Sequence, residues 1–205
     1  MEWQFELQVI SKILGDRVDI DKVKDRLMKL NVLEGKVPVK EKQIFFQFST
    51  NENTKKEFKK SMMGQLEIAF QILINQGYKI FVCDSHGEDI EIGKSFVGVF
   101  KTEAIQYVRD IEENSGILDL LCESSIQLVL DREDIAYPLV LSKPFIALFD
   151  DGELEKRLEL ENTFINKDEF NAGTLVNIVK YKEENNEKSK EAIKRIFNRY
   201  SRDLS

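Results

Sequence analysis

The chain has 205 residues, a formal net charge of −7 and a sequence pI of about 5.0. Hydrophobic residues make up 42% of it and charged residues 33%, which predicts one full domain with a solvated surface. The acidic balance argues against a continuous basic groove for nucleic acid, although it permits a local basic patch. No apolar run approaches the roughly 18 residues of a membrane span, and Cys83 and Cys122 lie in apolar runs, so we expect a cytoplasmic protein.

The N-terminal part is predicted to be helical, with one ambiguity at its start. Residues 3–14 begin with strand-like alternation but can continue as a helix, and both alternatives stay open. Residues 19–31 repeat apolar side chains at helical spacing, and Asp19 can cap that helix. Residues 43–48 are rich in phenylalanine and predict a buried strand.

A long helix is predicted over residues 54–75. Thr54 and Glu57 have the spacing of a capping box, which satisfies two backbone donors at the start of a helix. Apolar residues then follow at helical spacing on one face, and Gly77 ends the helix.

Residues 78–150 are interpreted mainly as strands separated by short polar turns. This pattern favours an antiparallel meander. The tail has a helical apolar stripe after a polar run. We therefore expect an α+β protein: a mainly antiparallel sheet with an N-terminal helical part and a C-terminal helix, divided into residues 1–182 and 183–205. The predicted strands are 78–83, 95–101, 126–130, 137–141 and 145–149.

The sequence offers no residue set that we assign to catalysis or to a metal. His86 is the only histidine, and the usual ligand spacings are absent around it. Asp84, Asp89, Glu91 and Lys94 resemble the acidic residues and lysine of a metal-dependent nuclease, but Lys94 follows Glu91 by three positions, which would place them on opposite faces of a strand. The glycines form neither a dinucleotide fingerprint nor a P-loop.

Two lysine-bearing helix faces are the candidate nucleic-acid contacts. Lys56, Lys59 and Lys60 fall on one face of the predicted helix 54–75, and Lys190 and Lys194 share a face of the C-terminal helix. Direct binding through these lysines would neutralise phosphates and would weaken as salt increases.

The central region resembles the bacterial nucleoid-associated protein family. The resemblance rests on residues 95–103, Ser-Phe-Val-Gly-Val-Phe-Lys-Thr-Glu, and on residues 77–83, Gly-Tyr-Lys-Ile-Phe-Val-Cys, and it extends over residues 45–150. It implies a strand at 95–101 after a strand that closes a long helix, and association with DNA or with enzymes that act on DNA.

We accordingly expect a non-catalytic protein, without cofactor or metal, that is associated with nucleic acid or with a nucleic-acid enzyme. One alternative is a protein–protein interaction component of a phage-defence system or mobile element, and such a component could be a homo-oligomer. A second alternative is a metal-dependent nuclease that uses Asp84, Asp89, Glu91 and Lys94.

Overall fold

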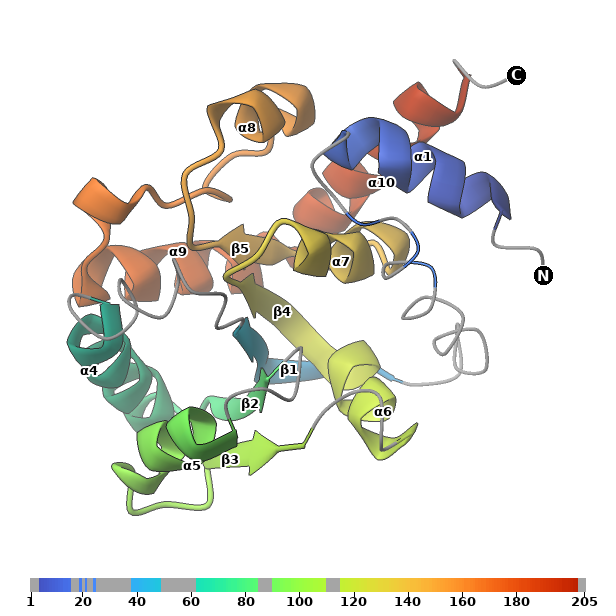
Figure 1. The fold of residues 1–205 in the computed structure, drawn as a ribbon. Helices are drawn as coiled ribbons and strands as arrows, with labels where there is room; N and C mark the ends of the chain where they lie inside the picture. The colour runs from blue at the N-terminus through green and yellow to red at the C-terminus, as the bar shows by residue number, and fades with distance from the viewer. Residues whose placement is uncertain are drawn as a thin grey trace.

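Parallel strands form a sheet in the middle of the computed structural model, which describes residues 4–15, 19, 21, 24, 38–48, 62–84, 90–109 and 115–202 (Figure 1). The strand order is β3-β2-β1-β4-β5, and every pair of neighbours is parallel. The expected α+β class with a mainly antiparallel sheet is therefore wrong, and the chain has an α/β fold. The strands are β1 (Lys40–Phe48), β2 (Lys79–Asp84), β3 (Ile105–Val108), β4 (Ser124–Val129) and β5 (Phe145–Ala147).

Helices connect the strands, which is why the strands run parallel. A parallel pair needs a crossover connection, and a helix usually supplies it. The described helices are α1 (Gln4–Leu14), α4 (Met63–Asn75), α5 (Ile90–Gly98), α6 (Ser115–Glu123), α7 (Ala136–Val140), α8 (Gly152–Leu158), α9 (Ala172–Glu184) and α10 (Asn186–Arg202), with short 3₁₀ turns at Glu133–Ile135 and Lys167–Glu169.

Two segments predicted as strands are helices. Residues 95–101 lie in and after α5, where Gly93, Phe96 and Phe100 are buried at spacings of three and four, while Gly98, which would share a strand face with Phe96 and Phe100, is exposed. This burial follows the helical repeat, so β-propensity was the wrong guide. Residues 137–141 belong to α7 and its end, and Pro138 fits there because a proline is tolerated in the first turn of a helix.

The two faces of the sheet are covered by separate sets of helices. Phe45, Cys83 and Val129 point into the core formed with α1, α6, α7, α8 and α10. The strand residues that alternate with these, among them Ile44 and Val82, point to the other face and pack against α4, α5 and α9. Strands covered on both faces are buried throughout, and β4 has no exposed position.

Aromatic rings fill the core under α4 and α5. The ring of Phe70 on α4 meets Phe46 of β1 edge-on at 5.5 Å and Phe96 of α5 at 5.7 Å between centroids. Edge-to-face contacts of this kind add about 0.5–1.5 kcal/mol per pair beyond the area they bury. They fix α4 and α5 on the same face of the sheet.

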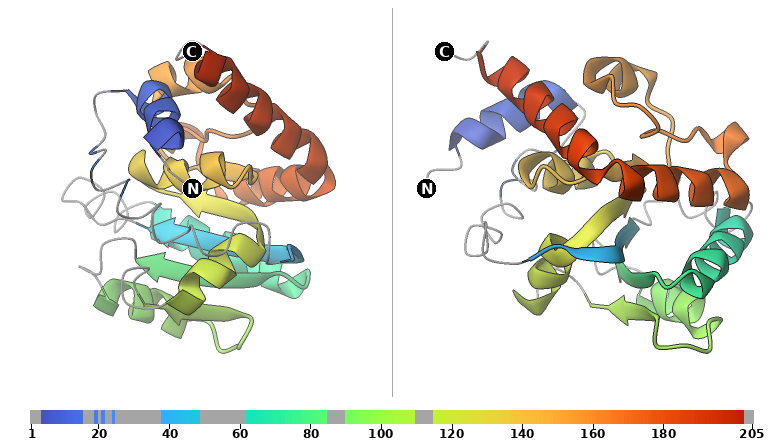
Figure 2. Two further views of the ribbon diagram at one scale, coloured as in Figure 1. Left: turned by 90° about the vertical axis from the view of Figure 1, so that its right-hand side faces the viewer. Right: turned by 180° about the vertical axis from the view of Figure 1, so that it is seen from behind.

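The helix α10 closes the opposite face together with α1. The two helices pack on each other although they are far apart in the sequence (Figure 2). The predicted apolar stripe of the tail lies on α10, where Ile193 and Ile196 are buried. No described helix is long and apolar enough to cross a membrane.

Candidate functional site

The strand order reverses between β1 and β4, and this identifies the first candidate site. From β1 the chain adds β2 and β3 on one side and then returns to add β4 and β5 on the other. In open parallel sheets ligands bind outside the carboxyl ends of the strands at such a reversal. The described part of that edge consists of the last residues of β1 and β2 and the residues that follow β4 and β5.

At this carboxyl-end edge, a buried ion pair ties together the segments after β4 and β5. The Nε of Arg132 donates to Oδ2 of Asp151 at 2.5 Å, and the side chains are only 12% and 10% exposed. Arg132 also donates to the carbonyl of Leu14 at the end of α1 (2.9 Å), and Asp151 caps α8 by accepting from the amide of Leu154 (3.0 Å). A guanidinium has five donor hydrogens, so Arg132 keeps donors for a further oxyanion.

Further carboxylates lie at the carboxyl ends of the strands. Asp84 ends β2 and is fully buried, and the side chain of Asp131 accepts from the amide of Glu133 at 3.2 Å. A carboxylate at the end of a strand beside such a reversal is the usual partner of ribose hydroxyls in dinucleotide-binding folds. The edge therefore combines a cation that suits phosphate with acids that suit hydroxyl groups.

A second candidate lies at the opposite, amino-end edge. A cavity of about 630 Å³ is lined there by Lys42, Ser125, Glu183 and neighbouring residues of the α9–α10 turn. Glu183 accepts from the backbone amide of Lys42 at 2.9 Å and from the hydroxyl of Ser125 at 2.8 Å. These bonds hold α9 to the starts of β1 and β4, so we interpret Glu183 as a structural residue.

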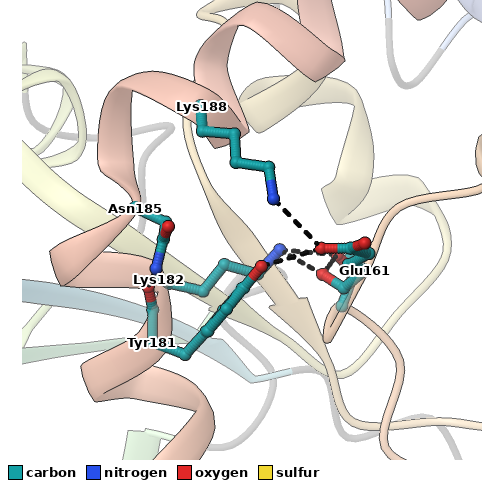
Figure 3. Close-up of polar contacts among 6 residues, drawn as sticks. Glu161, Tyr181, Lys182, Asn185 and Lys188 are labelled. Carbon is teal, nitrogen blue, oxygen red and sulfur yellow. Dashed lines mark hydrogen bonds and ion pairs between the residues drawn. The ribbon is translucent and has the colours of Figure 1, made fainter.

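A third group of polar residues lies where α9 meets α10 (Figure 3). Lys182 is 3% exposed, and its ammonium donates to Oγ1 of Thr163 at 2.7 Å and to the carbonyl of Glu161 at 2.8 Å. Burial lowers the pKa of Lys182 to about 8, against the opposing effect of the Glu161 charge. The carboxylate of Glu161 accepts from Tyr181 Oη at 2.8 Å and from Lys188 Nζ at 3.4 Å.

Of the five lysines selected from the sequence as nucleic-acid contacts, two lie in the described part of the chain. Lys56, Lys59 and Lys60 lie outside the described residues. Lys190 and Lys194 lie on α10, and each is paired with a glutamate three positions earlier, at 2.7 and 3.1 Å. Such pairs on one helix cancel much of the positive charge that phosphate would need.

Of the residues considered for a nuclease, those that the structure describes do not lie on two neighbouring strands. Glu91 and Lys94 lie on α5 rather than on a strand, Asp84 ends β2, and His86 and Asp89 lie outside the described residues. Within the described part of the chain, no group of acidic, cysteine or histidine side chains is arranged to hold a metal ion. Cys83 and Cys122 are buried thiols, as predicted.

Sequence reasoning missed the main residues of these sites, although two signals were present. Leu175, Val179 and Lys182 follow one another at helical spacing, so Lys182 falls on the apolar stripe of α9 and is buried with it. The run 131–134 directly follows a correctly predicted strand. It was interpreted as a short polar turn between two strands, because residues 137–141 were predicted to be a strand.

Comparison with known proteins supports the α/β fold and contradicts the predicted relationship to nucleoid-associated proteins. No protein-family profile and no curated protein sequence matches the chain. Solved structures with GT-B glycosyltransferase-like folds do match, at low identity. A protein described as a UDP-N-acetylglucosamine 2-epimerase from Listeria monocytogenes has a TM-score of 0.53, 12% identity, and coverage of 91% of this chain and 45% of its own.

Two further structures have the same type of fold. The Escherichia coli heptosyltransferase WaaC, solved with ADP, has a TM-score of 0.50 and 15% identity over 73% of this chain and 45% of its own. A UDP-forming α,α-trehalose-phosphate synthase from Burkholderia xenovorans has a TM-score of 0.51 and 11% identity over 95% of this chain and 47% of its own. The chain thus spans about half the length of these structures.

These matches overturn the predicted relationship to nucleoid-associated proteins. The segment that carried the resemblance, residues 95–103, contains the end of α5 rather than a strand. The DNA partner and the nucleic-acid-associated function that the family implied are therefore wrong. The GT-B-like α/β fold of the matched structures also contradicts the phage-defence and nuclease alternatives. The resemblance was a short coincidence of apolar and glycine residues.

Proposed function

We propose that the chain is a nucleotide-binding domain whose ligand is the nucleoside diphosphate part of a nucleotide sugar, bound at the carboxyl-end edge of β1 and β4. The observation that carries this proposal is the reversal of strand order between β1 and β4. The matched structures support the ligand class, because two of them are named for UDP or a UDP-sugar and the third was solved with ADP.

The proposed roles of the residues follow from their charge and position. Arg132 would donate to diphosphate oxygens with its remaining hydrogens, while its bonds to Asp151 and Leu14 hold it in place. Asp131 and Glu133 would accept from ribose hydroxyls. Cytoplasmic location is part of the same proposal, and the two buried thiols suit a reducing compartment.

The test is an NMR titration of the chain with UDP, ADP and UDP-N-acetylglucosamine. We expect saturable shifts of the amides in residues 130–134 and 148–151. The R132K variant retains the charge but loses the fork of donors, so we expect roughly tenfold weaker binding, equivalent to about 1.4 kcal/mol.

A matched control distinguishes phosphate binding from general damage. Arg157 of α8 donates to the carbonyl of Ile13, one residue from the carbonyl that Arg132 holds. The R157K variant should therefore perturb α1 in a similar way and leave the affinity for UDP unchanged. Absence of saturable shifts with all three nucleotides, or shifts confined to the α9–α10 corner, would contradict the proposal.

A further inference from the structure

Three donor side chains surround one glutamate at the corner between α9 and α10. Tyr181 Oη and Lys188 Nζ both donate to the same carboxylate oxygen, Oε2 of Glu161, while Lys182 Nζ binds its backbone carbonyl below (Figure 3). A phenol and two ammonium groups form a set of donors that binds oxyanions in general. Glu161 is the anion that this set holds.

The carboxylate of Glu161 can leave this position without unfolding its segment. Its side chain is 71% exposed and that of Lys188 is 66% exposed, so their ion pair is weak and screened by solvent. The backbone is held independently, since Lys182 binds the carbonyl of Glu161 and the hydroxyl of Thr163. The carbonyl of Thr163 also accepts from the amide of Ala147 in β5 at 2.7 Å.

The corner has both the space and the charge for a small ligand. Tyr181, Lys182, Lys188 and Ser189 help to line a cavity of about 200 Å³, several times the roughly 30 Å³ share of one water molecule. The hydrogen bond from Tyr181, followed by the charge of Lys188, lowers the pKa of the Glu161 carboxyl, so the corner favours a negative group. The other carboxylate on its lining, Glu159, is paired with Arg199 at 3.6 Å.

We propose that Tyr181, Lys182 and Lys188 form a binding site for a small oxyanion, a phosphate or carboxylate group, and that the carboxylate of Glu161 occupies this site until such a ligand displaces it. The site is separate from the carboxyl-end edge. Glu183, the residue after Lys182, binds the starts of β1 and β4 and so places this end of α9 at the opposite edge of the sheet.

The test compares the wild type with E161Q by NMR titration with inorganic phosphate and, separately, with acetate at matched ionic strength. We expect amide shifts in residues 181–189 and an affinity for phosphate in E161Q roughly tenfold higher than in the wild type, which corresponds to a site that Glu161 fills about nine-tenths of the time. E161A removes the carboxylate without supplying an amide and should bind phosphate as E161Q does.

Two further variants separate the site from a general charge effect. E67Q makes the same charge change at an exposed position on α4 and should bind phosphate no better than the wild type. Adding K188M to E161Q should abolish the gain. Acetate binding without phosphate binding would assign the site to a carboxylate ligand; equal, unsaturated titrations of wild type, E161Q, E161A and E67Q with both anions would overturn the proposal.

Discussion

The side-chain nitrogen of Gln47 lies 3.3 Å from the side-chain oxygen of Gln127, on the adjacent central strands β1 and β4. Both residues are fully buried. Within the described residues, Oε1 of Gln47 and Nε2 of Gln127 have no hydrogen-bond partner. The pair therefore places one unsatisfied acceptor and one unsatisfied donor in the core under α1 and α7.

This arrangement predicts strongly non-additive substitutions. Each single variant, Q47M or Q127M, removes the hydrogen bond between the two side chains and leaves the remaining buried amide without that bond. Each should lower the unfolding free energy by about 1–3 kcal/mol. The double variant removes both polar groups and should be close to the wild type. Urea denaturation of the four proteins measures the coupling energy, and single effects that simply add would show that the amides act independently.

The buried ammonium of Lys182 predicts a pH-dependent stability. Its folded pKa is about 8, below the ordinary 10.5, so the unfolded chain binds more protons between these values and the free energy of unfolding rises with pH. The wild type should gain roughly 3 kcal/mol relative to K182M between pH 8 and 10.5. Urea titrations across that range measure the difference. The variant K180M, at an exposed position of the same helix, should show no such trend relative to the wild type.

The ion pair of Arg132 with Asp151 predicts a large loss on removal of one partner. R132M leaves the Asp151 carboxylate buried without its counter-charge and should cost about 3–5 kcal/mol. D151N should cost less, because its amide oxygen can still cap α8 at the amide of Leu154. Denaturant unfolding gives both values, with E155Q on the exposed side of α8 as the control; a loss in R132M no larger than in E155Q would contradict the role of the pair.

Replacing each of two glycines of α5 by alanine should change the stability of the protein differently. A Cβ on Gly93 would lie 2.4 Å from Tyr107 and 2.8 Å from Phe48, whereas one on Gly98 would meet nothing within 4 Å. G93A should therefore destabilise the protein by about 1–3 kcal/mol through overpacking. G98A should be neutral or stabilising by up to about 1 kcal/mol. Thermal unfolding compares the two, and a neutral G93A would show that the sheet and α5 can separate freely.

Local elements were predictable where burial and periodicity agree. Strands β1, β2, β4 and β5 were found close to their actual positions because their phenylalanine, isoleucine and valine residues are buried on both faces. The prediction of a strand at 95–101 was wrong because a short apolar run fits both the strand repeat and the helical repeat, and the two are distinguished by the burial of Gly93 with Phe96 and the exposure of Gly98.

Strand direction could not be obtained from the sequence once two helices had been mistaken for strands. With 95–101 and 137–141 counted as strands, the remaining connections were short enough for hairpins, and antiparallel pairing followed. The same error hid the candidate site, because only parallel strands bring their carboxyl ends to one edge. Lys182 and Arg132 then had no reason to be selected over Lys190 and Lys194 of α10.

The packing of α1 against α10 also bears on how the chain reaches its native state during synthesis. The apolar residues Ile10 and Ile13 of α1 are fully buried in a core that includes Ile193 and Ile196 of α10. The central strand β1 similarly pairs with β4, whose residues are made some 80 positions later. A growing chain must leave these surfaces uncovered until α10 has left the ribosome, which predicts slow folding and dependence on chaperones.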